Sequence, residues 1–177
     1  MKALLFPGQG VQKIGMLDEI ISSNSEIYDF LAKASEGLDF DLIKLIASGP
    51  EEKLNLTEYA QPAILASSIT IIRAKKLNSN ISVTAGLSLG EYSALVYANC
   101  LKFSDALKLV NVRGRLMQNA VPEGTAGMLV ILNMDLNEVY KMIDSVNSSG
   151  EQINFSTDKA EGVSVLAGKN SSIDACK

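Results

Sequence analysis

The chain has 177 residues, of which 47% are hydrophobic and 20% are charged, a balance typical of a soluble globular protein with one domain or with one domain and part of another. Sixteen Lys and Arg against twenty Asp and Glu give a net charge of -4. No dense run of basic residues occurs, so we do not expect nucleic-acid binding.

The sequence lacks a stretch long enough to span a membrane. Its opening apolar run, residues 3–6, stops at Pro7, and no later run approaches the length of about 18 residues that a span needs. We therefore expect a cytosolic (cytoplasmic) protein. Cys100 and Cys176 have neither metal-ligand nor disulfide spacing and are expected to be reduced structural thiols.

The first residues predict a strand that feeds a glycine loop. Residues 2–6 are a short apolar run. Gly8 and Gly10 follow it and permit backbone conformations that other residues rarely adopt. Residues 25–37 and 41–47 have helical spacing and are punctuated by glycine. We expect two packing helices there.

A long helix and a second strand are predicted next. Thr57 is the expected N-cap of a helix that has Pro62 near its first turn and ends near the basic pair at 75–76. Residues 81–85 are rich in β-branched side chains and predict a strand. A tight turn at Ser88 and an apolar helix follow it.

Ser104 is the expected N-cap of another helix. The inward stripe of this helix is expected to comprise Ala106, Leu109, Val110, Leu116, Met117 and Ala120. Its solvent side is expected to comprise Lys108, Asn111, Arg115 and Gln118. Arg113 falls on the apolar stripe, where a guanidinium is costly unless it meets an anion or lines a cavity. An internal ion pair and a ligand-binding arginine are equally compatible with this pattern.

The remaining residues predict a smaller α+β part. Residues 128–132 form its first expected strand, and Asp135 with Glu138 forms a capping box for a helix. Strands at 152–155 and 163–167 and the start of a further helix complete the order β-α-β-β-α. This order is a split βαβ unit of ferredoxin-like type without its last strand.

Ser88 lies in a G-x-S-x-G run between Gly86 and Gly90. A nucleophilic serine has to project from a sharp turn, and small flanking residues keep the strand and the helix from colliding with it. The turn also puts the N–H of Leu89 at a helix N-terminus, where it can face a developing oxyanion. The five residues alone are a weak signal, but the strand, the helix and the first glycine loop around them favour catalytic use.

The chain contains no histidine. A serine hydroxyl is a poor nucleophile unless a base takes its proton, and histidine is the usual base. No Ser-x-x-Lys begins at Ser88, and Glu91 is expected to stabilise the first helical turn instead. The chain therefore lacks a complete serine-histidine dyad, and the base has to come from elsewhere.

Several motifs together resemble the malonyl-CoA:acyl-carrier-protein transacylases, in the order in which that family has them. They are F-P-G-Q-G-V-Q at 6–12, Q-P-A at 61–63, G-L-S-L-G-E-Y-S-A-L at 86–95 and V-R-G-R-L-M-Q at 112–118. The runs A-V-P-E-G-T at 120–125 and I-N-F at 153–155 are also similar to that family.

The resemblance implies a role for five residues. Ser88 would be the nucleophile that carries the malonyl ester, and the backbone N–H groups of Gln9 and Leu89 would form the oxyanion hole. Arg113 would bind the free carboxylate of the malonyl group and so reject acetyl. Gln61 would line the same pocket, although a glutamine before a helix is ordinarily solvated when it is judged alone.

The resemblance also implies the fold and the partners. The fold would be an α/β, hydrolase-like acyltransferase large subdomain over 1–124, with a parallel sheet and flanking helices, plus an incomplete ferredoxin-like small subdomain over 125–177. The substrates would be malonyl-CoA and acyl carrier protein in fatty-acid biosynthesis, with no metal or other cofactor. Complete members continue further and bring a catalytic histidine, so we expect an N-terminal portion of such a protein. A separate C-terminal fragment is a candidate partner.

Two other hypotheses stay open. One is a non-catalytic acyl-binding or carrier-binding module, which includes a chain completed in trans by a polypeptide that supplies the histidine. The other is an α/β-hydrolase esterase, which shares the serine turn. An esterase needs an acidic residue and a histidine later in the chain and has no need of Arg113.

Overall fold

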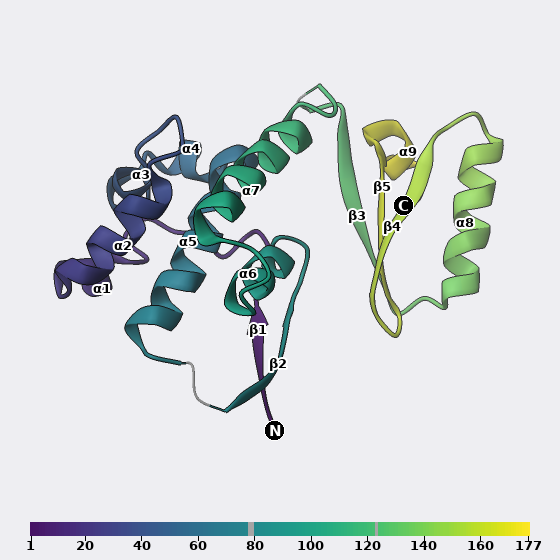
Figure 1. Ribbon diagram of the computed structural model, residues 1–177. Coiled ribbons are helices and arrows are strands. Elements are labelled where there is room, and N and C mark those ends of the chain that lie inside the picture. Colours follow the sequence, from purple (N-terminus) through teal and green to yellow (C-terminus); the bar gives the residue numbers. More distant parts are fainter. Residues whose placement is uncertain (78–79, 123) are drawn as a thin grey trace. The chain divides into compact units, whose positions relative to one another are not determined.

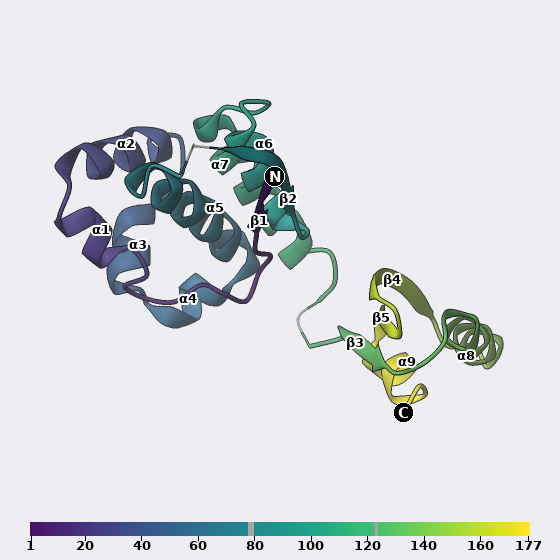
Figure 2. The ribbon, with the colours of Figure 1, turned by 90° about the horizontal axis from the view of Figure 1, so that it is seen from below.

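The computed structural model describes residues 1–77, 80–122 and 124–177. It contains two compact units, Met1–Gln118 and Asn119–Lys177 (Figures 1 and 2). Within the described ranges, no helix combines the length and the apolarity that a bilayer span requires.

The first unit is a small parallel sheet with helices around it. Its elements are β1 (Lys2–Phe6), α1 (Asp18–Ser22), α2 (Ser25–Ser35), α3 (Leu42–Ser48), α4 (Glu51–Asn55), α5 (Thr57–Ala74), β2 (Ile81–Gly86), α6 (Leu89–Tyr97) and α7 (Phe103–Gln118). β1 and β2 are parallel neighbours, with Phe6 opposite Gly86, and α6 packs against both strands. The predicted strands and the α/β class of this unit are confirmed.

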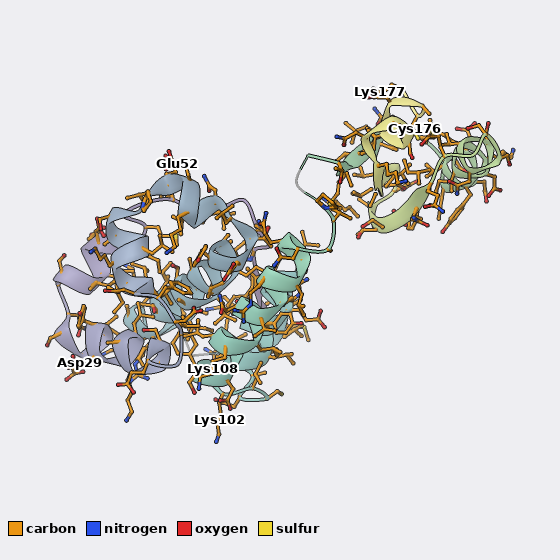
Figure 3. All side chains as sticks on the ribbon, turned by 90° about the horizontal axis from the view of Figure 1, so that it is seen from above. Asp29, Glu52, Lys102, Lys108, Cys176 and Lys177 are labelled. Atoms are coloured by element: carbon orange, nitrogen blue, oxygen red, sulfur yellow. The ribbon has the colours of Figure 1, made fainter. Side chains whose placement is uncertain are left out.

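α5 forms the centre of the core of the first unit. It is apolar on nearly every side, as expected of a helix surrounded by other elements, and it packs on α2, α4, α6 and α7. Leu65 on α5 and Leu107 on α7 are fully buried. Figure 3 shows charged side chains such as Asp29, Glu52 and Lys102 pointing away from these helices.

The expected N-cap of α5 is wrong. Thr57 is the first residue of the helix, and the capping position is Leu56, whose side chain makes no capping hydrogen bond. The N–H of Thr57 instead donates to the side-chain oxygen of Gln118, 3.1 Å away at the end of α7. A distant side chain therefore does what a local cap ordinarily does.

The expected orientation of α7 is also partly wrong. The helix begins at Phe103, so Ser104 lies inside its first turn and is not the N-cap. Its buried residues are Ala106, Leu107, Val110, Asn111 and Gly114, whereas Leu109, Leu116 and Met117 are exposed and Ala120 lies beyond the end of the helix. The reason is that α7 meets α5 through Gly114, where a Cβ would lie 2.5 Å from the carbonyl oxygen of Thr57. This close approach turns Asn111 inward and Leu109 outward.

The second unit is an antiparallel sheet with helices. Its elements are β3 (Ala126–Leu132), α8 (Leu136–Ser148), β4 (Ile153–Ala160), β5 (Val163–Lys169) and α9 (Asn170–Asp174). β5 lies between β3 and β4 and is antiparallel to both, so β3 and β4 run in the same direction and α8 connects them. This is the predicted split βαβ arrangement. Asp135 caps α8 by accepting a hydrogen bond from the N–H of Asn137, as expected of its position.

The division between the units falls at residues 118/119, whereas the sequence placed it at 124/125. α7 ends at Gln118, and the segment after it is joined to the start of α9 within the second unit. The side chain of Asn170 donates to the carbonyl of Gly124 at 2.7 Å, and its N–H donates to the carbonyl of Thr125 at 3.1 Å.

Candidate active site

The two glycines of the serine turn lie where backbone segments touch. A Cβ on Gly86 would collide with the backbone of Gly90, and a Cβ on Gly90 would collide with the carbonyl of Phe6 at the end of β1. Because no larger residue fits at either place, the G-x-S-x-G spacing brings β1, β2 and α6 together at one point.

Ser88 occupies the turn between β2 and α6. Its backbone has φ of 53° and ψ of -105°, a conformation that a residue with a side chain rarely adopts. The residue is exposed, and α6 begins immediately after it at Leu89. The conformation is the sharp strand-to-helix turn that the motif predicted.

The loop after β1 approaches the serine turn. A Cβ on Gly8 would lie 3.1 Å from the carbonyl oxygen of Leu87. The side chain of Gln9 donates to the hydroxyl of Thr57 at 3.2 Å, and that of Gln12 donates to Asn55 at 2.9 Å. The start of α5 and the residues before it therefore hold this loop.

The backbone N–H groups of Gln9 and Leu89 are the expected donors of the oxyanion hole. In the part of the chain that the structure describes, neither donates to a protein acceptor. The N–H of Leu89 is one of the first N–H groups of a helix, which have no partner within the helix. Leu89 itself is only 1% exposed, so its side chain is packed in the core while its N–H lies at the serine turn.

Arg113 links α7 to Ser88. Its Nη2 donates to Ser88 Oγ at 3.1 Å, its Nη1 donates to Gln61 Oε1 at 2.7 Å, and its Cζ lies 5.6 Å from the ring centroid of Tyr92. Among the described residues, no carboxylate forms an ion pair with this guanidinium. Of the two roles that the sequence left open for Arg113, the internal ion pair is not formed.

Gln61 is fully buried, so it differs from the solvated glutamine that is ordinary at such a position when judged alone. Its Oε1 accepts from Arg113, and its Nε2 lies 3.3 Å from Met117 Sδ. The carbonyl therefore faces the guanidinium and fixes one of its donors. The position of Gln61 directly before Pro62 gave no sign of this contact.

Sequence reasoning also missed two residues at this site. Tyr92 lies four residues after Ser88 on α6, the spacing that puts two residues on one helix face, and this spacing was the available signal. Thr57, assigned to capping, holds Gln9 through its hydroxyl instead. Within the described ranges, no cluster of three or more acidic or cysteine side chains suited to a metal ion occurs.

Comparison with known families assigns the chain to one of them. Residues 3–161 match the family described as "Acyl transferase domain". The chain belongs to the acyl transferase domain family. This membership favours acyl transfer over the esterase alternative.

The chain is similar to curated proteins named malonyl CoA-acyl carrier protein transacylase. It is 39% identical over 172 residues to a malonyl CoA-acyl carrier protein transacylase of Staphylococcus aureus and 42% identical over 175 residues to that of Haemophilus influenzae. Each match covers 97% of this chain but 56% of the relative, so the chain spans little more than half the length of these relatives.

Solved structures agree with this similarity. A malonyl CoA-acyl carrier protein transacylase from Clostridium perfringens superposes with a TM-score of 0.89 at 35% identity, covering 98% of this chain and 55% of that one. A malonyl-transacylase solved in complex with a type II PKS acyl-carrier protein gives 0.87 at 40% identity, covering 98% and 57%. These matches confirm the expected acyltransferase fold.

Proposed function

We propose that the site takes a malonyl group from malonyl-CoA, holds it as an ester on Ser88, and delivers it to the phosphopantetheine thiol of an acyl carrier protein. The observation that carries this proposal is the guanidinium of Arg113, which lies 3.1 Å from Ser88 Oγ and forms no ion pair with a carboxylate of the described residues. A cation beside the nucleophile suits an acyl group that bears its own negative charge.

Arg113 would bind the free carboxylate of the malonyl group. A guanidinium can donate two parallel hydrogen bonds to a carboxylate, and Gln61 leaves Nη2 facing the nucleophile. The malonyl carboxylate would take the Nη2 donor that Ser88 Oγ now accepts, which would free the hydroxyl for attack. An acetyl group has no carboxylate and would leave this cation unpaired.

The first half-reaction forms an oxygen–carbon bond and breaks a carbon–sulfur bond. Ser88 Oγ attacks the thioester carbonyl, the N–H groups of Gln9 and Leu89 donate to the oxyanion, and coenzyme A leaves as the thiol. The proton of Ser88 passes through a base to the leaving sulfur. Because the printed sequence has no histidine, we assign this base to a group outside it.

The second half-reaction returns the acyl group to sulfur. The phosphopantetheine thiol attacks the ester on Ser88 and regenerates the serine hydroxyl. Thioester, ester and thioester have the same oxidation state, so the transfer has no need of a redox cofactor. The names of the similar proteins and the solved complex with a carrier protein support this choice of substrate and partner.

The proposal extends to the compartment and to the rest of the site. A cytosolic location, as in fatty-acid biosynthesis, suits Cys100 and Cys176, which are free thiols. The absence of histidine from the sequence favours one variant of the proposal, in which a second polypeptide completes the site in trans. In that variant, this chain alone binds the acyl group and the carrier protein but does not catalyse the complete transfer.

Transfer to the carrier tests the proposal. The 177-residue chain is incubated with malonyl-CoA and phosphopantetheine-bearing acyl carrier protein, alone and with a polypeptide that matches the remaining length of a relative, and malonyl-carrier is measured by mass spectrometry. We expect transfer that is lost in Ser88→Ala. Transfer only in the mixture would support completion in trans, and none in either sample, with folded protein, would contradict the proposal.

A further inference from the structure

Pro62 lies inside α5 and leaves a backbone carbonyl without its helical partner. A helix carbonyl accepts from the N–H four residues later, and the residue four positions after Glu58 is Pro62, which has no N–H. The side chain of Asn111 on α7 donates to this carbonyl, with Nδ2 3.1 Å from Glu58 O. Asn111 is only 6% exposed, so this hydrogen bond is shielded from water.

The next turn of α7 touches the same part of α5. A Cβ on Gly114 would lie 2.5 Å from Thr57 O and 2.7 Å from Glu58 Cα. Asn111 and Gly114 thus hold α7 against the first turn of α5 by a hydrogen bond and by direct backbone contact. Arg113 lies between these two residues in the sequence.

The guanidinium of Arg113, at the far end of its side chain, contacts the same stretch of α5. Gln61, which accepts from Nη1 at 2.7 Å, directly precedes Pro62. The backbone of Arg113 is therefore fixed through Glu58 and its guanidinium through Gln61, within a single turn of one helix. A shift of α7 along α5 would move the arginine backbone while Gln61 stayed in place.

We infer that Asn111 is a positioning residue for Arg113, and that it acts by bonding the carbonyl that Pro62 leaves free. This inference rests on the proposed function, because it assigns the effect of Asn111 to the recognition of a malonyl carboxylate. Two parallel hydrogen bonds tolerate little displacement, and a misplacement of about 1 Å can lower a rate by about 10²-fold.

The proline provides a specific test. In Asn111→Leu the buried carbonyl of Glu58 has no donor, so α7 is expected to move away from α5 until water reaches that carbonyl. An N–H at position 62 satisfies the carbonyl within α5, and the contact at Gly114 can then keep α7 in place. In Pro62→Ala, the new N–H of residue 62 donates to Glu58 O within the helix. The effect of Asn111→Leu should then be smaller in the Pro62→Ala background than in the wild type. Coupling of this kind between two substitutions is what a double-mutant cycle measures.

The experiment compares wild type, Asn111→Leu, Pro62→Ala and the double variant, with Leu109→Ala as a control at an exposed position of α7. Initial rates of Ser88 acylation from malonyl-CoA and acetyl-CoA are followed by intact-mass spectrometry, with the completing polypeptide present and below the lowest melting temperature. We expect Asn111→Leu to lower the malonyl rate about 10-fold and the acetyl rate by less than about 2-fold, and the double variant to recover most of the loss. Equal loss for both acyl groups, or no recovery, would overturn the inference. Asn111→Ser, too short to reach Glu58, replaces Asn111→Leu if that variant does not fold.

A second readout separates this inference from the proposed function. The Nε–H resonance of Arg113, assigned by comparison with Arg113→Lys, reports the environment of the guanidinium without any substrate. It should shift in Asn111→Leu and return in the double variant. If wild type forms no malonyl ester, the proposed function fails and this resonance alone decides the inference. An unchanged resonance in Asn111→Leu would overturn it.

Discussion

Arg113 Nη2 donates a hydrogen bond to Ser88 Oγ at 3.1 Å, although 25 residues separate the two in the sequence. The bond joins α7 to the turn between β2 and α6. The side chain of Gln61, from the middle of the core, fixes the other terminal nitrogen of the same guanidinium. The site therefore has an exposed serine hydroxyl and a directed cation, each held by a different element.

Replacing Arg113 should change the choice of acyl group. Arg113→Ala removes the proposed carboxylate ligand, so acylation by malonyl-CoA should fall by about 10²- to 10³-fold while acylation by acetyl-CoA falls much less. Arg113→Lys keeps the charge without the paired donors and should give an intermediate malonyl rate. Competition between the two thioesters, read by intact mass, measures the ratio. Arg115→Ala is the control, and an unchanged ratio in Arg113→Ala would refute the assignment.

Replacing Gly90 should destabilise the first unit. In Gly90→Ala the new methyl group meets the carbonyl of Phe6 and lies 2.8 Å from the carbonyl oxygen of Pro7, so backbone has to move. We expect a loss of roughly 3 kcal/mol in the free energy of unfolding, measured by urea titration with circular dichroism. In Gly127→Ala the nearest atom is the end of the Ile173 side chain at 3.3 Å, and we expect little change. Equal midpoints for the two variants would count against the close packing at Gly90.

Valine should have different effects at two threonines of α5: it should slow acylation at one position and raise stability at the other. Thr57→Val removes the acceptor of Gln9 and should slow acylation about 10-fold, less than the 10²- to 10³-fold expected when an oxyanion donor is lost outright. Thr70 is fully buried, and its hydroxyl has no partner among the described protein atoms. Thr70→Val should therefore raise stability by about 1 kcal/mol and leave the rate unchanged. A slower Thr70→Val, or an unaffected Thr57→Val, would contradict the distinction.

The second unit should lose stability in acid through Glu151. Hydrogen bonds from Ser172 and then Ser171 hold the pKa of this carboxyl below its usual value. The carboxylate therefore stabilises the folded state above the unfolded pKa of about 4.3, and this contribution is lost as the pH falls through the lower folded-state pKa. Thermal melts from about pH 5 to pH 3 should show a weaker acid dependence in Ser172→Ala and Glu151→Gln. Ser148→Ala, at an exposed serine, should behave as wild type. Identical profiles for all variants would rule out this role.

The elements were predictable where the signal is local. β1, β2 and the strands of the second unit follow from short apolar runs between turn residues, and Gly86 and Gly90 follow from the steric needs of one turn. The short helices α1 and α4, of five residues each, are too brief for an apolar period to reveal them. Local patterns therefore gave most of the fold and the serine turn.

The contacts between distant helices were not predictable in this way. A helical pattern cannot show that Gly114 lets α7 approach α5, and this approach decides that Asn111 is buried and Leu116 exposed. Likewise, the sequence around Gln61 is typical of a surface glutamine, and only the structure shows that the side chain of Arg113 lies beside it. The arginine itself was predictable because a charge on an apolar stripe requires a partner, but its partners lie on other elements.

The most direct test of the account is the intact mass of the 177-residue chain after incubation with malonyl-CoA and the polypeptide that matches the remaining length of a relative, because the proposed base lies outside this sequence. We predict a single malonyl adduct on wild type, mapped to the peptide that contains Ser88 and lost in Ser88→Ala. Folded wild-type chain without an adduct, or an adduct that persists in Ser88→Ala, would contradict the claim that Ser88 carries the acyl group.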